Sequence, residues 1–392
     1  MGTKKRTAKR QFEELAGDAE RRSDDRAPAA NVSDAKATGS VFFANHTSVM
    51  PGPLDHFESY LWRHGRDTVR IDHPLDGYEG NSSVLRRNGK PMRAWKRHDR
   101  GPLGLFWDFA RTIMIALRTR ASVAIGANNF DTYSLLTARR LRLAYKPRVI
   151  YYAIDYSEDR FRNPVMNWIY MRVERSALRR ADLVVSNTRR AESRRVELGL
   201  DRRKSVIVPN GVLLAQAEFA PKPIHKDHFI FVGSVTREHG LYELLAAIKP
   251  LIGSLTIIGR GDDSERVLRL CEQQQIPYVV HSQWPHDAVL EYLRDFEGFG
   301  LAPYNRYSKW TYYCSPMKVS EYISLGVPVI TSSVPEVAET IKAEKLGIVY
   351  EQGDLEEIKA ALDDFDATDF HLRAQKFYAA FNSDTLFERV GL

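Results

Sequence analysis

Short apolar runs and longer amphipathic segments alternate along most of the chain. The first run, residues 40–44, is long enough for one strand, and residues 54–64 then carry apolar side chains at helical spacing. Further runs of strand length lie at residues 68–71, 122–126, 148–154, 182–186, 228–233, 255–258, 278–281, 299–303 and 329–330. Such alternation predicts strands joined by helices, and therefore an α/β fold with largely parallel sheets.

The pattern divides into two halves. A Val-Pro-Asn-Gly sequence at residues 208–211 follows the last run of the first half, and the next run begins at residue 228. With 392 residues, the chain is long enough for two domains of ordinary size. We predict one Rossmann-like domain over residues 39–213 and a second over 214–370. Residues 1–38 mix charged residues and alanine with few large apolar side chains, which predicts a disordered tail.

The segment from residue 310 to 336 carries the most specific pattern. It predicts a loop, a helix over 317–325, a turn at Gly326 and Pro328, and a buried strand. Ser315 is expected to cap the helix, because serine oxygens accept from the first backbone amides. The helix N-terminus, Lys318 and Glu321 then offer a site for a diphosphate with a carboxylate nearby for sugar hydroxyls.

This segment, SPMKVSEYISLGVPVI, resembles the donor-binding segment of GT-B glycosyltransferases in the GT4-like superfamily. The resemblance implies a GT-B fold, with two Rossmann-like domains facing a central cleft and residues 371–392 packing back toward the first domain. It implies that Glu321 binds the nucleotide ribose and that Lys318 lies near the phosphates. Many retaining members carry a second glutamate where this chain has Tyr313. An ordinary amphipathic helix followed by a strand is the alternative.

Further donor-side residues are expected on the same resemblance. The turn after the strand at 228–233 resembles the first turn of the GT4-like donor domain, although the usual cationic pair is replaced by other residues. The loop before residue 286 is expected to lie against the nucleobase. The predicted donor-binding set is Gly233, Ser234, Arg237, His239, Trp284, Ser315, Met317, Lys318, Glu321 and Tyr322.

Polar residues at strand ends are the candidates in the first domain. Asp155 ends the strand at 148–154, and ligands in such sheets meet the carboxyl ends of strands. It also resembles the base of one inverting GT-B family. In an inverting enzyme Asp155 deprotonates the acceptor hydroxyl; in a retaining enzyme it binds the acceptor; a turn or cap residue is the third possibility. His46 and Asn128 are expected on the acceptor side, with loop packing as the alternative for His46.

A basic segment is followed by an aromatic amphipathic one over residues 86–118. Such a combination is typical of a surface that binds anionic membranes, and a buried helix beside a solvated basic loop is the alternative. The formal net charge of +7 favours anionic partners. No spanning helix or signal peptide is expected, so we predict a cytoplasmic protein that is peripheral at most. The basic residues are Arg86, Arg87, Lys90, Arg93, Lys96, Arg97 and Arg100.

These patterns together predict a glycosyltransferase that moves a sugar from a nucleotide sugar, UDP- or GDP-linked, to a glycan or lipid-linked acceptor. No metal is expected, because no Asp-x-Asp motif stands at a strand end, and the two cysteines form no metal or disulfide framework. A GT-B sugar-nucleotide epimerase is the alternative. A basic nucleic-acid binder is a third class, without a recognition motif to support it, so no nucleic acid is expected as a partner.

Overall fold

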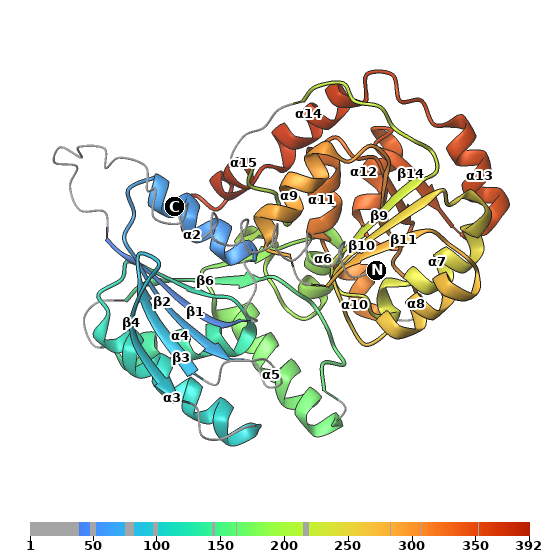
Figure 1. Ribbon diagram of the computed structural model, residues 1–392. Helices are drawn as coiled ribbons and strands as arrows, with labels where there is room; N and C mark the ends of the chain where they lie inside the picture. Colours follow the sequence, from blue (N-terminus) through green and yellow to red (C-terminus); the bar gives the residue numbers. More distant parts are fainter. Residues whose placement is uncertain are drawn as a thin grey trace, which may run out of the picture. The chain divides into compact units, whose positions relative to one another are not determined.

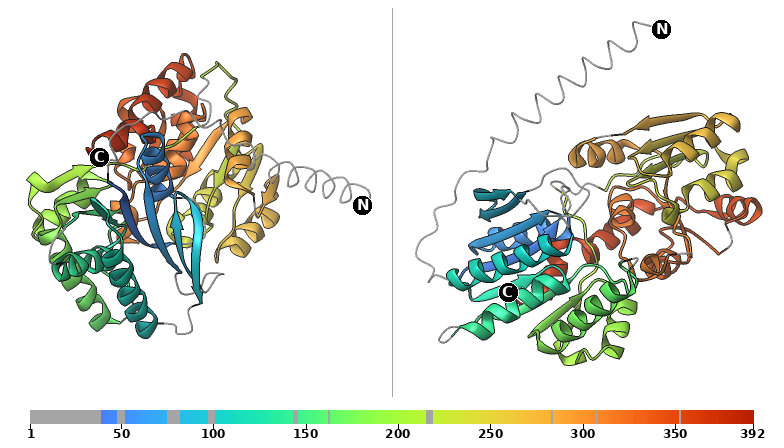
Figure 2. Two further views of the ribbon diagram at one scale, coloured as in Figure 1. Left: turned by 90° about the vertical axis from the view of Figure 1, so that its left-hand side faces the viewer. Right: turned by 90° about the horizontal axis from the view of Figure 1, so that it is seen from below.

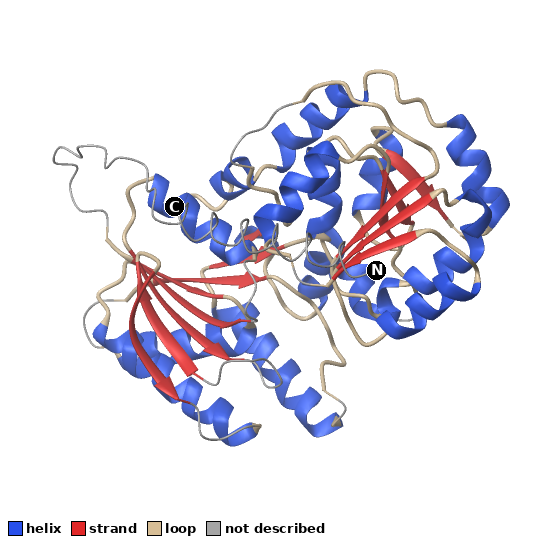
Figure 3. Cartoon of the chain, viewed as in Figure 1, coloured by secondary structure: helices blue, strands red, loops and turns tan. Residues whose placement is uncertain are grey.

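The structure is a computed structural model that describes residues 39–47, 52–74, 82–96, 101–142, 146–161, 163–214, 219–282, 284–306, 308–351 and 353–392. The predicted tail, residues 1–38, lies outside this range, as do Arg97 and Arg100 of the basic segment. Within the described part, strands form two sheets, each covered by helices (Figures 1 and 3).

The first sheet has eight strands in the order β4-β3-β2-β1-β5-β6-β7-β8. All neighbours are parallel except the pairs β2–β3 and β3–β4. The parallel strands read as nearly continuous apolar runs because helices cover both of their faces. The strands are β1 (Val41–Thr47), β2 (Thr68–Pro74), β3 (Ser82–Arg87), β4 (Lys90–Lys96), β5 (Val123–Gly126), β6 (Arg148–Ala153), β7 (Leu183–Ser186) and β8 (Ser205–Ile207).

Two helical layers enclose this sheet. Buried residues of α3 (Pro102–Arg118) and α4 (Asn129–Leu141) form one core cluster with the sheet, and α2 (Pro53–Arg63) forms another. Helix α4 packs between α3 and α5 (Pro164–Arg180), as the views in Figure 2 show. Helix α6 (Arg189–Glu197) and the short helix η1 (Arg202–Lys204) complete this half.

The second sheet is wholly parallel and has six strands in the order β11-β10-β9-β12-β13-β14. They are β9 (His228–Val232), β10 (Ser254–Ile258), β11 (Tyr278–His281), β12 (Phe299–Ala302), β13 (Val329–Ser332) and β14 (Gly347–Tyr350). The connecting segments are η2 (Arg237–His239), α7 (Leu241–Ile248), η3 (Lys249–Leu251), α8 (Ser264–Gln273), α9 (His286–Asp295), α10 (Lys309–Tyr313), α11 (Met317–Ser324), α12 (Val337–Ala343) and α13 (Leu355–Asp364).

Each sheet has one point at which the strand order reverses. In the first sheet this point lies between β1 and β5, and in the second it lies between β9 and β12. Loops that leave the two strands there run to opposite sides, which opens a crevice at the carboxyl ends. The candidate residues His46 and Asn128 follow β1 and β5, and Gly233 follows β9.

Two parts of the chain differ from the expectation. Residues 82–96 form the antiparallel hairpin β3–β4 instead of a basic loop, because Asn88 and Gly89 supply the positive φ angles of a tight turn. The C-terminal segment is two helices instead of one. Helix α14 (Phe370–Phe381) packs in a core cluster of the second sheet, and only α15 (Ser383–Glu388) packs on α2 of the first.

Candidate active site

The centre of the site is the amino group of Lys318. This residue lies in the first turn of α11, and its Nζ is buried without a hydrogen-bond partner among the described residues. The amine stands 4.1 Å from the ring centroid of Phe231, and burial lowers its pKa to about 7, against the raising effect of Glu321 and Cys314. A buried amine with no acceptor is costly, so its place indicates a site for an anion.

The turn after β9 leaves room for that anion. Gly233 has a φ of +114°, and a Cβ there would come within 3.3 Å of Lys318 Nζ. A Cβ on Gly259, at the end of β10, would collide with the Gly233 carbonyl oxygen at 2.0 Å. The two turns therefore need glycine, and an exposed backbone beside the amine lets a phosphate approach closely.

The residues that follow Gly233 supply little positive charge. The His239 ring donates a hydrogen bond to the Ser234 backbone, and its Nδ1 lies 3.1 Å from Thr236 Oγ1. Burial and the nearby Lys318 lower the pKa of His239 to about 3, so its ring stays neutral at physiological pH. The Arg237 side chain is 80% exposed, with Nε 3.7 Å from Asp263. Lys318 is therefore the cation closest to the glycine turn in this group.

Glu321 lies one turn after Lys318 and is buried. Its Oε1 is 2.8 Å from Nε2 of His286, the first residue of α9, and this bond raises the pKa of His286. Tyr322, the next residue, is fully buried, and its hydroxyl accepts the Val232 amide at 2.7 Å. The structure thus places Tyr322 behind the site, where it joins α11 to β9, and not on a surface open to a donor.

The start of α11 is held by the Val-Pro-Asn-Gly segment. Ser315 Oγ accepts the Asn210 amide at 2.9 Å, and the Ser315 carbonyl accepts Asn210 Nδ2 at 2.7 Å. Ser320 Oγ donates to the Asn210 carbonyl. Ser315 is therefore not the helix cap that we expected: Pro316 occupies that position and makes no side-chain cap. No side chain therefore caps the first turn, in which the Val319 amide donates to the Pro316 carbonyl at 3.2 Å.

Two further donor-side predictions lie at the edge of this group. Met317 is the first residue of α11 and is half-buried. Trp284 is also half-buried and stacks on His281 with ring centroids 4.2 Å apart, while Tyr292 meets its edge. The indole is thus held in a fixed orientation beside α9, which suits a stacking surface.

Asp155 follows β6 and is exposed at its carboxyl end. The Asp155 carbonyl accepts Arg195 Nη2 at 2.9 Å, and Arg195 is itself buried against Glu174. Desolvation by the surrounding protein raises the pKa of the Asp155 carboxyl, although the charges of Arg160 and Arg195 lower it. Burial raises the pKa of Cys314 to about 12, and the Asp155 charge adds to this rise. Asp155 is therefore close to the segment that leads into α11.

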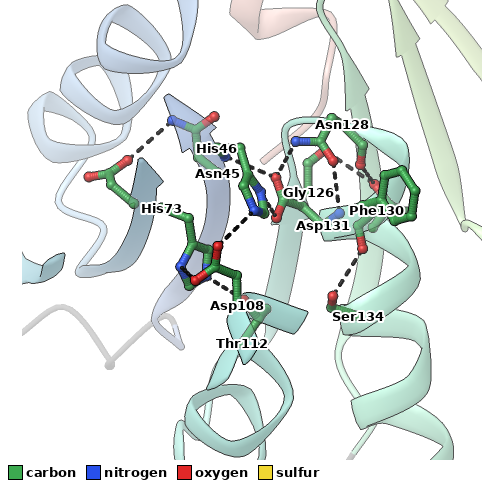
Figure 4. Close-up of polar contacts among 12 residues, drawn as sticks. Asn45, His46, His73, Asp108, Thr112, Gly126, Asn128, Phe130, Asp131 and Ser134 are labelled. Carbon is green, nitrogen blue, oxygen red and sulfur yellow. Dashed lines mark hydrogen bonds and ion pairs between the residues drawn. The ribbon is translucent and has the colours of Figure 1, made fainter. Parts of the chain in front are cut away.

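His46 and Asn128 meet at one carboxylate, that of Asp131 (Figure 4). His46 Nδ1 lies 2.9 Å from Asp131 Oδ1, and its amide donates to Oδ2 at 3.1 Å. Asn128 caps α4 by accepting the Asp131 amide, and its Nδ2 donates to the same carboxylate. The strand-order reversal brings these residues together, because β1 and β5 are neighbours.

A second carboxylate holds the other side of the His46 ring. Asp108 Oδ2 is 3.7 Å from His46 Nε2, and Asp108 also lies 3.3 Å from His73 Nδ1. Although burial opposes it, these two carboxylates raise the pKa of His46 to about 9, so the imidazole is charged at neutral pH. The pKa of Asp108 is well below its usual range, because its bonds to the two histidines outweigh burial. With its side chain only 10% exposed, His46 is mainly a packed ion pair at the crevice edge.

Sequence reasoning missed several of these residues. Asp108 and Asp131 lie in helices, where a single carboxylate forms no recognisable motif. The histidine that both contact, His46, is far from them in the sequence. His286 follows a Trp-Pro pair at a helix start, and this position was the only signal available for it. No group of three or more His, Cys, Asp or Glu residues that could hold a metal ion occurs in the described part of the chain.

Comparison with known proteins follows the same division into two halves. Residues 64–211 match the family model of the glycosyl transferase 4-like domain, and residues 229–381 match that of the glucosyltransferase 3-like C-terminal domain. The putative colanic acid biosynthesis glycosyltransferase WcaL of Escherichia coli K12 is 25% identical over 249 residues. That alignment covers 60% of this chain and 59% of the relative.

Solved structures of similar fold cover nearly the whole chain. HepE of Anabaena in complex with UDP has a TM-score of 0.63 at 14% identity, over 90% of this chain and 98% of that one. The lipopolysaccharide outer core galactosyltransferase WaaB has a TM-score of 0.64 at 15% identity, with the same coverage. Identities this low show the fold alone, which confirms the predicted α/β GT-B class. The two family models, a glycosyl transferase 4-like domain in the first half and a glucosyltransferase 3-like C-terminal domain in the second, support a GT4-like GT-B glycosyltransferase.

Proposed function

We propose that this chain transfers a sugar from a UDP-linked donor to a glycan or lipid-linked acceptor in polysaccharide or glycoconjugate synthesis. The observation that carries the proposal is the buried Lys318 amine without a hydrogen-bond partner in the described structure, which lies over the bare backbone of Gly233. WcaL is described as a colanic acid biosynthesis glycosyltransferase, and HepE was solved with UDP. Both descriptions support a UDP-sugar donor and a glycan acceptor.

On the donor side, the leaving diphosphate is stabilised by the Lys318 amine and the uncapped amides at the start of α11. Glu321 accepts the ribose hydroxyls, and Trp284 contacts the base. No divalent ion is required in this scheme, because the helix N-terminus and the lysine supply the positive charge.

On the acceptor side, Asp155 is the general base. The acceptor oxygen forms a bond to the anomeric carbon, its proton passes to the Asp155 carboxylate, and the bond to the diphosphate breaks with its electron pair. A carboxyl with a raised pKa is a better base than an ordinary one, which suits this role. The anomeric configuration is inverted by this route.

The membrane proposal gains support from α3. Its buried residues face the sheet, yet the opposite side is also apolar and exposed: Phe106 is 60% and Trp107 56% accessible. Helix α5, on the other side of α4, exposes Trp168, at 61%, beside Arg172. In the part of the chain that the structure describes, no helix is long and apolar enough to cross a bilayer. We therefore propose peripheral docking on an anionic, cytoplasmic membrane face through residues 86–118.

The test of the donor site uses Lys318→Ala and Glu321→Ala. Hydrogen bonds to charged groups contribute about 1.5–3 kcal/mol, so UDP affinity should fall about 10- to 100-fold in each. Calorimetric titration with UDP measures this, and Lys376→Ala, an exposed lysine paired with Glu344, is the matched control. Unchanged UDP binding in both variants would refute the assignment.

Two other functions remain distinguishable by experiment. The two family models, WcaL and WaaB are described as glycosyltransferases, and none of the matches supports the sugar-nucleotide epimerase. Radiolabel that passes from a UDP-sugar into a lipid or glycan fraction identifies a transferase, whereas an epimerase returns all label to the nucleotide pool. Salt-dependent RNA retention without UDP binding would instead identify a nucleic-acid binder.

A further inference from the structure

The contact between His286 and Glu321 joins two helices of the second sheet. The distance from His286 Nε2 to Glu321 Oε1 is 2.8 Å. The Glu321 side chain is 7% exposed, whereas that of His286 is 29% exposed. A buried carboxylate therefore has one oxygen engaged by an imidazole that is itself accessible.

Charge strengthens this contact. The hydrogen bond to Glu321 raises the pKa of His286 more than burial lowers it, and Asp287 adds to the rise. His56 of α2 is close enough for its pKa to be lowered by His286 and raised by Glu321, although burial is the larger cause of its lowered pKa. His56 itself is held at Nδ1 by Ser383 Oγ. A charge-assisted bond is stronger than a neutral one and fixes the carboxylate plane.

The two helices are also fastened at their other ends. Lys222 Nζ donates to the carbonyls of Leu293 and Arg294 in the last turn of α9, at 3.2 and 3.0 Å. It donates as well to the carbonyl of Leu325, the C-cap of α11, at 2.9 Å. Because Lys222 holds one end and His286 the other, α9 and α11 cannot shift along each other without breaking these bonds.

We propose that His286 is a positioning residue that orients the Glu321 carboxylate toward the nucleotide ribose. By engaging Oε1, it leaves the second carboxylate oxygen to accept the ribose hydroxyl. The inference rests on the proposed function, in which Glu321 is the ribose contact. His286 acts through Glu321 and needs no contact with the reacting atoms.

The experiment compares UDP with 2′-deoxy-UDP and 3′-deoxy-UDP by calorimetry. Wild-type protein should prefer UDP over at least one deoxy analogue by about 10-fold or more, since a lost bond to a carboxylate costs about 1.5–3 kcal/mol. His286→Ala should reduce this preference several-fold. His286→Gln should restore most of it, because the glutamine Nε2 can donate from nearly the same place. Inorganic diphosphate should bind all three proteins equally.

The outcomes distinguish the positioning role of His286 from the ribose role of Glu321 on which it rests. If Glu321→Ala keeps the wild-type preference, the ribose role of Glu321 fails and the positioning role with it, whereas the proposed function fails only if UDP binding is unchanged in both Lys318→Ala and Glu321→Ala. If Glu321→Ala loses the preference while His286→Ala keeps it, only the positioning role is overturned. Should His286→Ala not fold, His286→Asn replaces it, because asparagine is too short to reach Glu321. Equal loss in the Ala and Gln variants would also overturn the inference.

Discussion

At the residue scale, the site depends on two charged groups whose pKa values are shifted by the surrounding protein. Lys318 and Asp155 both have pKa values shifted toward neutrality by burial or crowding, the amine downward and the carboxyl upward. Each shift disfavours the charged form in the unliganded protein. A bound diphosphate reverses the effect for Lys318, and a nearby acceptor hydroxyl gives Asp155 a proton to take. Shifts of this kind concentrate at functional sites.

Donor affinity should depend on pH through Lys318. Free Lys318 has a pKa of about 7, and a bound diphosphate favours its protonated form and raises that pKa. UDP-glucose affinity is therefore highest below pH 7 and should fall about 10-fold per unit as pH rises above 7, until the pKa of the complex is reached. UDP-glucose is suitable because its diphosphate diester does not titrate in this range. Calorimetry from pH 6 to 9 measures the effect.

The control is Lys318→Arg, whose guanidinium stays protonated. Glu321, Cys314 and His239 are the titratable groups that influence or are influenced by Lys318, and His239, with a pKa of about 3, does not titrate in this range. The His286–Glu321 pair is still present in Lys318→Arg. Its contribution to the pH dependence of UDP-glucose affinity is therefore removed when the two proteins are compared. An equally steep pH dependence in Lys318→Arg would assign the effect to those groups instead.

Asp155→Asn tests the base. Turnover should fall at least about 100-fold, given the usual value of general base catalysis, while UDP affinity stays within about twofold. In the wild type, the raised pKa moves the acid limb of the pH–rate profile upward, because the carboxylate must be deprotonated to act. Asp159→Asn, in the same loop and paired only at the surface with Lys309, is the control. Normal turnover in Asp155→Asn, or a product with retained configuration, would exclude the base.

At the element scale, α3 and the β3–β4 hairpin carry the membrane prediction. The hairpin carries Arg86, Arg87 and Arg93, and it contacts α3 where Arg111 lies over the Trp95 ring. Helix α3 is apolar on its exposed side as well. A soluble protein rarely exposes several large aromatic side chains together without a partner for them.

Flotation with acidic liposomes measures both contributions. Neutralising Arg86, Arg87 and Arg93 should weaken binding by up to about 1 kcal/mol per residue and remove its salt dependence. Phe106→Ser with Trp107→Ser should weaken binding at every salt concentration. Leu372→Ser, at an exposed leucine of α14, is the control. Wild-type flotation in both sets of variants would show that α3 and the hairpin do not bind membranes.

At the scale of the whole molecule, a few contacts connect residues of the two sheets. Glu336, just before α12, accepts the amides of Arg189 and Arg190 at the start of α6, at 3.0 and 2.8 Å. Thr188 Oγ1 donates to the Tyr313 carbonyl. Asn210 and α15 add the contacts described above. These links decide how the acceptor-side residues face α11.

Glu336→Ala should lower the free energy of unfolding by about 1 kcal/mol, because a carboxylate at a helix N-terminus satisfies two amides there. Glu339→Ala is the matched control. Its carboxylate pairs with Arg190 but is 73% exposed, so the change should stay within about 0.5 kcal/mol. Urea unfolding followed by circular dichroism measures both. Equal values for the two variants would show that Glu336 stabilises nothing beyond a surface ion pair.

Local pattern determined much of this protein. Apolar runs of strand length, glycines at turns and the SPMKVSEY segment predicted the α/β class, the family and the helix that carries Lys318 and Glu321, because these features depend on neighbours in the sequence. The hairpin β3–β4 was missed because β3 and β4 carry many basic residues among few apolar ones, and β4 contains Pro91.

Only the tertiary structure decided which distant side chains meet. It paired His46 with Asp131 and Asp108, Glu321 with His286, and Ser315 with Asn210. It also buried Tyr322 and left the Lys318 amine without a hydrogen-bond partner among the described residues. The physical reason is that strand order and helix packing set these distances. Strand order and helix packing do not produce a periodic pattern in the sequence. The burial and the charge of the site residues nevertheless depend on both of them.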